Sequence, residues 1–492
     1  MISSITALSL SQLALISLVL CGGFAVAKIF YNVFLHPLRA IPGPLSHRMT
    51  ILPRAFYHMN GNLSFHVTEL HKRYGTVVRV APNELAFSSP QAWRDIYGHK
   101  KNEFPKLPGR SLKVMPPSIQ DAEAAEHHMI RRHVLPGFSE RSMHEQEPII
   151  GAYVDLLVSR LKDATKINSR QNIRDWYTWT TFDLIGDLSF GVDGGFGCLQ
   201  GSSYHPWVKL INESFRQQGI VQGLISLGFR TPLTLLYKTA SNLFATNKHL
   251  LIVKEKIKER MEGSERPDFL DGLISHREKL GLDEDRLAMN ASVLIIAGSE
   301  TTATVLSAVT YYLGTLPDVL KKVEQEVRSA FTSDSEITLT SVGNLPFMLA
   351  CLDEALRCYP PLMNGGPRYT PDGGIIDGTV VPKNTVVTLY QYAINYSEKY
   401  WRNPQKFAPE RWMNDPLYED DNHDAMQPFG IGPRNCVGRN LAYAEMRLIL
   451  AKVLYNFDIS IADDSRNWLD GQKAYSVWVK PDLNVHLKPV SR

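Results

Sequence analysis

The residues with the clearest chemical meaning form a glycine-rich loop near the C-terminus. The loop reads Phe429-Gly-Ile-Gly-Pro-Arg434-Asn-Cys436-Val-Gly438, and helical spacing of apolar residues continues from it to Phe457. Two glycines and a proline favour a tight turn, which would place Cys436 at a helix N-terminus. Backbone N–H groups and the helix dipole stabilise a thiolate there, and a thiolate is a good iron ligand. The alternative is a glycine-rich turn around an incidental buried cysteine.

Glu300 and Thr301 form a second chemical group, in the middle of an apolar segment. Helical spacing extends over 282–316, and the apolar centre of this segment predicts a helix that runs through the core. Ala297 and Gly298 precede the pair, and their small size leaves room for a group next to the helix backbone. An acid and an alcohol suit the protonation of iron-bound dioxygen, because O–O cleavage requires protons. A helix kink with self-satisfied threonine hydroxyls is the alternative.

Glu354 and Arg357 form a third pair. They are three residues apart, so they lie on one face of the helix that we predict over 345–359 and can form an ion pair. An isolated pair of this kind is most often a solvated surface pair. Arg411 follows downstream, in Phe-Ala-Pro-Glu-Arg411-Trp.

Mainly helical elements, with a minor β part, must position these residues. No linker rich in proline, glycine or serine divides the chain beyond its N-terminal region, so we expect one domain over 45–492. The predicted helices cover 175–190, 282–316, 345–359 and 435–457, a β-hairpin covers 76–88, and short strands lie within 379–390 and 474–487.

The N-terminal region predicts a membrane anchor over 1–35, followed by a proline-rich elbow over 36–44. No charged residue occurs from Ile2 to Ala27, and the apolar stretch is long enough for a membrane-spanning helix. Basic residues follow the stretch and none precedes it, which puts the bulk of the chain in the cytosol. A cleaved signal peptide is the alternative, but the basic n-region is missing and the apolar run is longer than is typical.

The bulk composition excludes several classes of protein. The 492 residues are 44% hydrophobic and 21% charged, which is ordinary for a globular protein and unlike a disordered chain. The formal net charge of +3 gives no reason to expect nucleic acid as a partner. Five cysteines form no CxxC pair, which argues against a disulfide scaffold and a structural zinc site.

Together, these motifs resemble the cytochrome P450 family. The cysteine loop matches the family's haem-binding signature in full, and the group around Glu300 resembles its oxygen-activation motif. The elbow and the ending Val477-Trp-Val-Lys-Pro resemble membrane-anchored members of fungal secondary metabolism, such as the trichothecene (isotrichodermin) hydroxylases. The resemblance implies the cytochrome P450 fold with one N-terminal transmembrane helix, and haem b as the cofactor.

The resemblance also assigns roles to individual residues. It makes Cys436 the axial ligand of the haem iron, and it makes Glu300 and Thr301 the catalytic proton-delivery pair. The haem propionates require charge-assisted hydrogen bonds from basic residues, although a surface arginine remains the alternative for Arg131 and Arg368. The remaining haem contacts that it implies are Phe429, Arg434, Gly438, His127, Arg131, Arg368, Ala297 and Gly298, and the buried structural triad is Glu354, Arg357 and Arg411.

The implied activity is that of a haem-thiolate monooxygenase. It would insert one oxygen atom from O2 into a lipophilic small molecule, by hydroxylation or epoxidation, in fungal secondary-metabolite biosynthesis. Electrons would come from NADPH through a separate NADPH–cytochrome P450 reductase on the endoplasmic reticulum membrane. The alternatives are a P450-type isomerase or dehydratase that does not use O2, and a non-catalytic haem-binding sensor.

The segments expected to line the substrate pocket are 104–115, 294–301, 362–366 and 475–478, with Asn364 as a polar contact. The candidates for reductase docking are Arg132, Lys321, Lys322 and Arg439.

Overall fold

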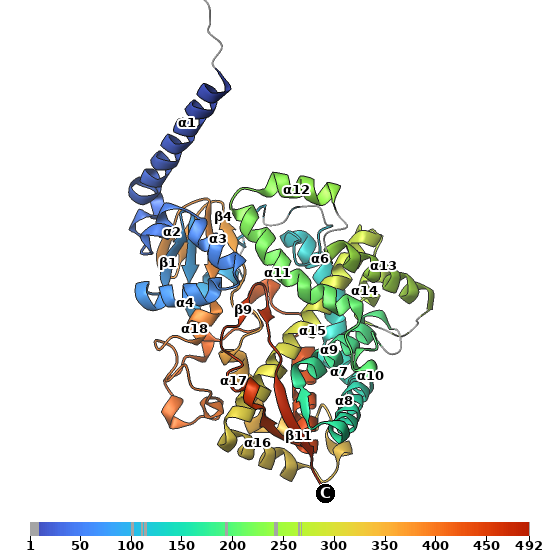
Figure 1. Cartoon of the computed structure of the whole chain (residues 1–492). Helices are drawn as coiled ribbons and strands as arrows, with labels where there is room; N and C mark the ends of the chain where they lie inside the picture. Colours follow the sequence, from blue (N-terminus) through green and yellow to red (C-terminus); the bar gives the residue numbers. More distant parts are fainter. Residues whose placement is uncertain are drawn as a thin grey trace, which may run out of the picture.

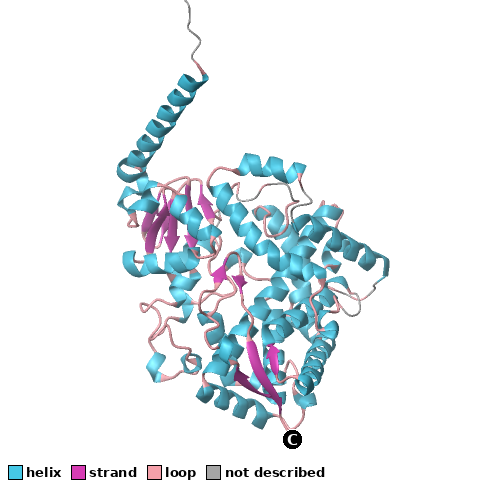
Figure 2. Ribbon diagram, viewed as in Figure 1, coloured by secondary structure: helices cyan, strands magenta, loops and turns pink. Residues whose placement is uncertain are grey.

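A computed structural model of the chain confirms a mainly helical protein with a minor β part (Figure 2). Helices make up most of the body, and the small sheets lie towards one side and near the C-terminus (Figures 1 and 2). The structure describes residues 9–99, 103–109, 112, 116–191, 195–240, 245–263, 266 and 268–491.

Helix α1 (Leu10–Phe30) projects from the body, and none of its residues is buried (Figure 1). Ser9 caps it, because its side chain accepts a hydrogen bond from the Gln12 N–H. The helix continues as a π-helical turn, Tyr31–Leu35, and residues 10–35 are long and apolar enough to span a membrane. This is the position that the sequence predicts for the anchor.

The turn after α1 and the elbow that follows it are fixed to the body by polar contacts. The Asn32 side chain donates to Met49 O at 2.9 Å, and the Arg79 N–H donates to Pro42 O at 2.8 Å. Gly43 lies against the same strand, where an added Cβ would be 2.4 Å from Arg79 O. A larger residue at Gly43 would therefore push the elbow away from the sheet.

A four-stranded sheet lies at the end of the body from which α1 projects (Figure 1). The predicted hairpin is confirmed: β1 (Val77–Ala81) and β2 (Glu84–Phe87) pair antiparallel. Strand β7 (Thr385–Leu389) joins β2 in parallel, and β4 (Arg368–Thr370) pairs antiparallel with β7, so the order is β1-β2-β7-β4. The sheet thereby brings Arg368 close to the N-terminal part of the domain.

Helix α15 (Glu284–Thr315) runs through the core beside α9 (Ile173–Phe190), as the apolar centre of its sequence predicts (Figure 1). It begins at Asp283, whose side chain accepts a hydrogen bond from the Arg286 N–H at 2.8 Å. The two helices pack closely at Gly298, since an added Cβ there would be 2.7 Å from Cδ1 of Ile185 in α9. The neighbour that an added Cβ at Gly298 would meet is Ile185, and the predicted role of Gly298 next to a cofactor stays a prediction.

The other elements complete the helical body and the small sheets. Both C-terminal strand regions that we predicted are divided between different sheets. In the first region, β6 (Thr379–Val381) pairs with β5 (Gly374–Ile376), while β7 joins the large sheet. In the second region, β10 (Trp478–Val479) pairs with β9 (Lys473–Ala474), while β11 (Asn484–Pro489) pairs with β3 (Arg170–Asn172) and β8 (Phe457–Ile461). The remaining helices are α2 (Leu45–Met49), α3 (Leu52–Met59), α4 (Leu63–Tyr74), α5 (Pro90–Tyr97), α6 (Ala124–Val134), α7 (Glu140–Glu145), α8 (Glu147–Ile167), α10 (Cys198–Gly201), α11 (Pro206–Ser226), α12 (Arg230–Thr239), α13 (Ala245–Gly263), α14 (Asp271–Ser275), α16 (Pro317–Ala330), α17 (Pro346–Cys358), α18 (Gln391–Asn395) and α19 (Arg439–Asn456).

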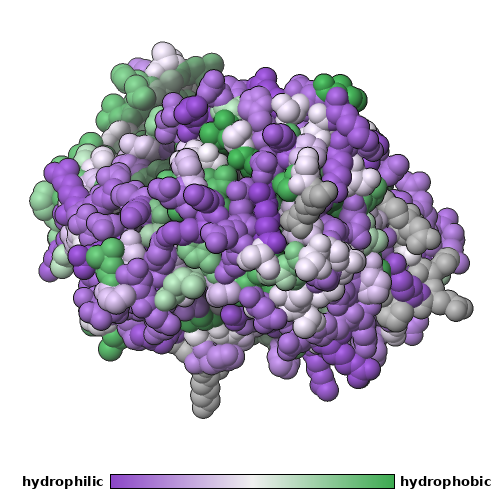
Figure 3. Space-filling view, turned by 90° about the horizontal axis from the view of Figure 1, so that it is seen from below, coloured by the Kyte–Doolittle hydropathy of each residue, from purple (hydrophilic) through white to green (hydrophobic). Residues whose placement is uncertain are grey.

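The face of the body seen from below, away from α1, is mostly hydrophilic (Figure 3). Exposed apolar side chains are instead frequent on α1 and on the short helices next to it, with Leu52 60% and Phe56 59% exposed on α3. This distribution fits a protein whose N-terminal side meets a membrane and whose far side meets water.

Candidate active site

The cysteine loop is a closed turn in front of α19. The Cys436 N–H donates to Phe429 O at 2.8 Å, and Gly430 and Gly432 both have positive φ. At Gly432 an added Cβ would lie 2.0 Å from Tyr97 O, so the loop packs directly against backbone at the end of α5. The glycines are therefore required by the shape of this loop.

Cys436 lies just before α19 and not within it. We predicted a helix from Asn435, but α19 begins at Arg439 with Gly438 as its N-cap. The physical reason is that the Cys436 N–H is already used to close the loop. Burial raises the pKa of the Cys436 thiol, and the N–H of Gly438 and the charges of Arg131 and Arg439 oppose that rise.

Cys436 is accessible to solvent, although the surrounding protein is close enough to raise its pKa. Both observations hold for a side chain that faces a space inside the molecule. Ala297 is likewise exposed in the middle of α15, whose neighbouring residues Ser299 and Glu300 are buried. Helices α15 and α19 pack against each other, so accessible side chains on these interior elements fit a bound group of considerable size.

Thr301 and Glu300 are adjacent in α15 but make different contacts. The Thr301 hydroxyl donates to Ala297 O at 2.7 Å, which is the self-satisfied arrangement of the alternative interpretation. Glu300 is 4% exposed, and its carboxylate forms an ion pair with Lys480. The ammonium of Lys480 also donates to the Thr304 hydroxyl at 2.8 Å.

Glu354, Arg357 and Arg411 come together in the interior. Arg357 and Glu354 form a 2.8 Å ion pair, Arg411 approaches the same carboxylate at 3.3 Å, and all three side chains are fully buried. Glu354 also accepts hydrogen bonds from the Ala408 N–H and the Trp412 indole, each at 3.0 Å. This is a fully bonded interior network, unlike the solvated surface pair of the alternative interpretation.

Four of the predicted haem-binding residues form a basic cluster, consisting of His127, Arg131, Arg368 and Arg434. Burial lowers the pKa of His127 to about 4, and the charges of Arg434, Lys106 and Arg131 add to this effect. Burial also lowers the pKa of Arg368, which is 9% exposed and feels the charge of Arg434. Three guanidinium groups that carry positive charge, beside an imidazole that can donate a hydrogen bond, suit an anionic ligand with more than one carboxylate.

Protein groups already bind two members of the basic cluster. Arg434 forms a 2.7 Å ion pair with Glu103 and donates to Ala122 O at 2.9 Å. Arg131 donates to the backbone oxygen and to the side-chain oxygen of Asn435, each at 2.6 Å. Arg131 therefore holds the residue directly before Cys436.

The comparisons with known proteins decide the family. The family model described as Cytochrome P450 matches residues 42–487. This chain belongs to the cytochrome P450 family. Cytochrome P450 monooxygenase tpeC of Talaromyces stipitatus is 47% identical over 494 residues, which cover 98% of this chain and 96% of that relative. The trichothecene C-15 hydroxylase of Fusarium sporotrichioides is 41% identical, with 96% and 98% covered, and the trichothecene C-4 hydroxylase of Trichoderma arundinaceum is 40% identical, with 93% of each chain covered.

Membership of the P450 family implies a haem iron with a cysteine thiolate ligand, a redox partner that supplies electrons, and a lipophilic substrate. The names of the relatives support a monooxygenase function in fungal secondary metabolism. The residues present in this P450 fit the haem: an accessible cysteine on a closed loop can supply the thiolate, and a partly buried basic cluster can pair with the propionates.

Glu445 is a residue of this P450 that sequence reasoning missed. It lies on α19, is fully buried, and burial raises its pKa to about 8. The Thr302 hydroxyl approaches and opposes the rise, but among the described residues neither carboxyl oxygen has a partner at hydrogen-bond geometry. The sequence could have shown this residue, because Glu445 occupies a position among helically spaced apolar residues. An acid at such a position is costly to bury unless it is neutral or paired.

Lys480 is the second residue that was missed. A buried acid such as Glu300 requires a partner, but Lys480 is 180 residues away in the sequence. The spacing of residues gives no information about a contact over such a separation.

The predicted substrate segments of the P450 lie in several elements. Residues 110, 111 and 113–115 of the first segment are outside the described part of the chain. Trp478 donates to Pro360 O at 2.7 Å, and the Tyr475 ring fits against Gly219 of α11, where an added Cβ would be 2.2 Å from it. The Asn364 side chain accepts a hydrogen bond from the Gly366 N–H at 3.1 Å, so its oxygen is used locally.

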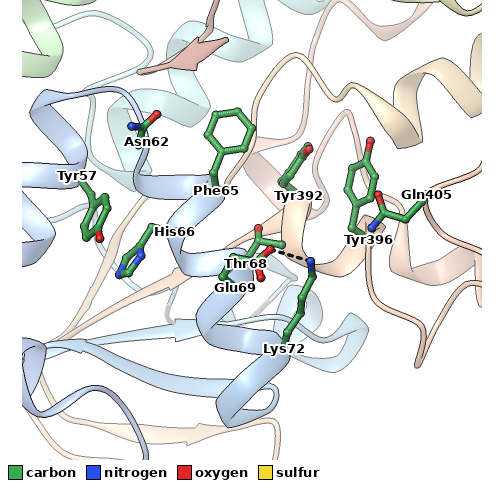
Figure 4. A pocket seen from close by; sticks show the side chains of 10 residues that line it. All are labelled: Tyr57, Asn62, Phe65, His66, Thr68, Glu69, Lys72, Tyr392, Tyr396 and Gln405. Carbon is green, nitrogen blue, oxygen red and sulfur yellow. Dashed lines mark hydrogen bonds and ion pairs between the residues drawn. The ribbon is translucent and has the colours of Figure 1, made fainter. Parts of the chain in front are cut away.

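A separate groove of about 400 Å³ opens on the outside of the P450 between α4 and α18 (Figure 4). Aromatic side chains and the 2.7 Å Lys72–Glu69 ion pair line it. None of the predicted haem or oxygen-activation residues is among its lining residues.

Proposed function

We propose that this P450 is a membrane-anchored haem-thiolate monooxygenase that hydroxylates a lipophilic secondary metabolite. The observation that carries the proposal is the closed glycine loop, which presents an accessible Cys436 directly before α19. Hydroxylation is favoured over epoxidation because two relatives are named hydroxylases. An O2-independent isomerase or dehydratase, or a haem-binding sensor, would not need the Glu300–Thr301 pair.

Cys436 supplies the thiolate to the haem iron in this proposal. Bound haem b supplies the binding and reduction of dioxygen, and the protein supplies orientation and charge. The Gly438 N–H and the Arg131 guanidinium stabilise the negative sulfur, and Phe429, whose ring lies 5.2 Å from that of Tyr443, covers it.

The basic cluster binds the haem propionates. His127 and Arg368 are buried and therefore desolvated, which strengthens hydrogen bonds to carboxylates. Arg434 must share its guanidinium between a propionate and Glu103, and it has enough donors to do so. Arg131 also donates a hydrogen bond to Asn435 O and so contacts the cysteine loop.

Glu300 and Thr301 move protons to the reacting oxygen atom. Ala297, one turn before Thr301, leaves the helix surface open there, and Gly298 lets α15 lie close to α9. Glu354, Arg357 and Arg411 would stabilise the core that holds the haem and would touch no reacting atom.

The anchor places the protein on the endoplasmic reticulum membrane in our proposal, with a single span over 1–35, the elbow over 36–44, and the catalytic domain over 45–492 in the cytosol. Helix α15 is the second helix that is long and apolar enough to span a membrane, but 72% of its most apolar window is buried in the core.

NADPH–cytochrome P450 reductase would deliver the electrons. Its docking candidates are the exposed residues Arg132, Lys321, Lys322 and Arg439, of which Lys322 also pairs with Glu410 at 2.9 Å.

The test is the carbon monoxide difference spectrum of the dithionite-reduced protein in microsomes, together with Cys436→Ala. We expect a strongly red-shifted Soret band in the parent and its complete loss in the variant, because the band reports a thiolate ligand. A folded, haem-loaded parent without the band would refute the proposed ligation. NADPH-dependent and O2-dependent consumption of substrate then separates a monooxygenase from the two alternatives.

A further inference from the structure

The groove between α4 and α18 combines aromatic rings with one acid and one base. Its volume of about 400 Å³ lies within the range of small-molecule sites. Figure 4 shows the rings of Phe65, Tyr392 and Tyr396 next to one another, with the Glu69–Lys72 pair below them. The Tyr392 ring centroid is 4.6 Å from that of Tyr396 and 5.5 Å from that of Phe65. These three rings therefore form one continuous aromatic wall.

The aromatic wall offers ring surfaces to a ligand in place of hydrogen-bonding groups. The Tyr396 hydroxyl donates to Cys358 O at 2.7 Å, so it is already used inside the protein. Phe65 has no polar side-chain atom, and its ring packs edge-on against Trp478 at 5.6 Å. The rings of the wall are all partly exposed. A ligand that binds to this wall must therefore do so through contacts with the rings.

Glu69 places a negative charge beside the aromatic wall. Burial raises the pKa of Tyr392 to about 12, and the Glu69 carboxylate is close enough to add to this rise. Glu69 is 67% exposed at its side chain and pairs at 2.7 Å with Lys72, which is 50% exposed. An exposed pair of this kind contributes little to stability, so a ligand can align with it at small cost. The acid and the rings together favour a cation.

A quaternary ammonium is the cation that this arrangement suits best. The faces of aromatic rings attract such an ion, and it needs no hydrogen-bond acceptor, whereas a primary ammonium is strongly hydrated. The side-chain oxygen of Asn62, which also lines the groove, already accepts a hydrogen bond from Lys473 at 3.0 Å. Lys72 adds a positive charge for an anionic group at the other end of the ligand. The groove is thus complementary to a zwitterion such as a phosphocholine ester.

The groove opens beside the part of the surface that fits a membrane. Tyr57, another lining residue, belongs to α3, on which Leu52 and Phe56 are 60% and 59% exposed. The ring centroids of Phe56 and Tyr57 are 5.6 Å apart. Helix α2 packs against both α3 and α1, so this side of the groove is near the base of the anchor (Figure 1). The headgroups of a bilayer are therefore the nearest source of a zwitterion.

We propose that this groove binds the phosphocholine headgroup of a membrane lipid. The ammonium lies on the aromatic wall beside Glu69, and the phosphate lies on Lys72. The bound lipid is then a second attachment of the body to the bilayer, next to α1. This inference rests on the membrane anchoring that we propose for this P450 and is independent of the haem chemistry.

The first test uses the soluble headgroup glycerophosphocholine and the full chain in a maltoside detergent, which contains no choline. Saturation-transfer NMR of the choline methyl protons measures binding, and we expect it to saturate. Glu69→Gln should weaken the binding of glycerophosphocholine and of choline alone, each about two- to fivefold, as for one exposed ionic contact. Lys72→Met should weaken the binding of glycerophosphocholine by a similar factor but should not weaken the binding of choline, which has no phosphate.

Lys166→Met is the matched control. Lys166 forms a surface pair of the same spacing as Lys72, 2.9 Å from Asp163, but it lies on α8 and does not line the groove. It should leave the binding of both probes unchanged. Tyr392→Leu removes one ring of the aromatic wall and should weaken the binding of both probes about two- to fivefold. Thermal unfolding followed by circular dichroism shows which variants fold, and the two charge variants on the surface decide the question if Tyr392→Leu does not.

The second test distinguishes a bilayer lipid from a soluble ester. The full chain is placed in nanodiscs of phosphatidylglycerol, or of phosphatidylcholine whose choline methyl groups are deuterated, so that only the methyl protons of the soluble probe are observed. We expect glycerophosphocholine to bind in phosphatidylglycerol and to lose most of its binding in phosphatidylcholine, because the lipid headgroups then occupy the groove. Empty nanodiscs of each kind correct for adsorption to the lipid.

The proposal is overturned if the parent does not bind the soluble headgroup, or if Glu69→Gln and Lys72→Met bind both probes as the parent does. Equal binding of glycerophosphocholine in the two bilayers would also overturn it, because the groove would then be out of reach of the lipid. Failure of the proposed anchoring is distinguishable from these results, since the full chain would then not enter either bilayer. The measurement in detergent would still decide whether the groove binds the headgroup.

Discussion

At the scale of single residues, the interior of this P450 holds acids in two opposite ways. Glu354 and Glu300 form ion pairs with arginine or lysine, whereas Glu445 is buried with no cation paired to it among the described residues. The difference is chemical: a paired carboxylate is acceptor-only, while a neutral carboxyl is both donor and acceptor and costs less to bury. Burial without a charged partner raises the pKa of Glu445 in this way.

Glu445→Gln should change how stability depends on pH. The Glu445 pKa is about 8 in the folded protein and 4.5 for an ordinary glutamate, so between these values the folded state holds more protons than the unfolded state. Stability of the parent therefore falls as pH rises through this window, by at most about 1.4 kcal/mol per pH unit from this group. The isosteric amide does not titrate and should escape that loss.

The measurement is the thermal midpoint of both proteins at pH 5.5 and 7.5 in detergent. The midpoint of Glu445→Gln minus that of the parent should be larger at pH 7.5. Equal differences at the two pH values would show that Glu445 is ionised in the fold.

At the scale of elements, the site depends on how closely α15 can approach its neighbours. Gly298→Ala should destabilise the protein by about 1–3 kcal/mol, because its Cβ would meet Ile185 of α9 at 2.7 Å. Gly151→Ala is the matched control: this glycine also lies within a helix, α8, but has no atom within 4 Å of an added Cβ. It should gain up to about 1 kcal/mol from helix propensity.

Chemical denaturation of both variants measures these changes, and Ile185→Ala is added to identify the cause. In the double variant the cost of Gly298→Ala should shrink, since the methyl group then has room. If the cost is the same with and without Ile185, the contact between α9 and α15 does not explain the glycine.

The elements that sequence patterns predicted were those with long or regular periods. The hairpin, α15 and the N-terminal apolar helix were all located within a few residues, because apolar spacing and turn residues act locally. The start of α19 was wrong by four residues, since the loop uses the Cys436 N–H for its own closure. Strands as short as β9 and β10 give too few residues for a period to be seen.

The site could be predicted as a set of residues but not as a set of contacts. The loop and the pair in α15 were recognisable from residue types in a fixed order. The partners Lys480, Glu103 and Asn435 come from distant segments or use side-chain directions that no spacing specifies. Physical reasoning required a cation next to buried Glu300, but only the packed fold selects which one.

At the scale of the whole molecule, the anchor should account for attachment to membranes. Removing residues 1–30, which leaves Asn32 and its contact with Met49 in place, should release the protein from microsomes during an alkaline carbonate wash, whereas the full chain should stay in the membrane pellet. The shortened protein should keep its carbon monoxide band, because none of the residues of α1 is buried against the body. Retention of the shortened protein in the washed pellet would show that another part of the chain is embedded.

Because the chain after α1 is fixed to the body, the orientation of α1 is coupled to the orientation of the body. The helix passes directly into the turn at Tyr31–Leu35, and contacts of Asn32 and Pro42 clamp the following chain to α2 and β1. A helix that tilts to match a thinner bilayer must therefore rotate the whole catalytic domain with it. The thickness of the bilayer should therefore influence which surface of this P450 faces the lipid and which faces its electron donor.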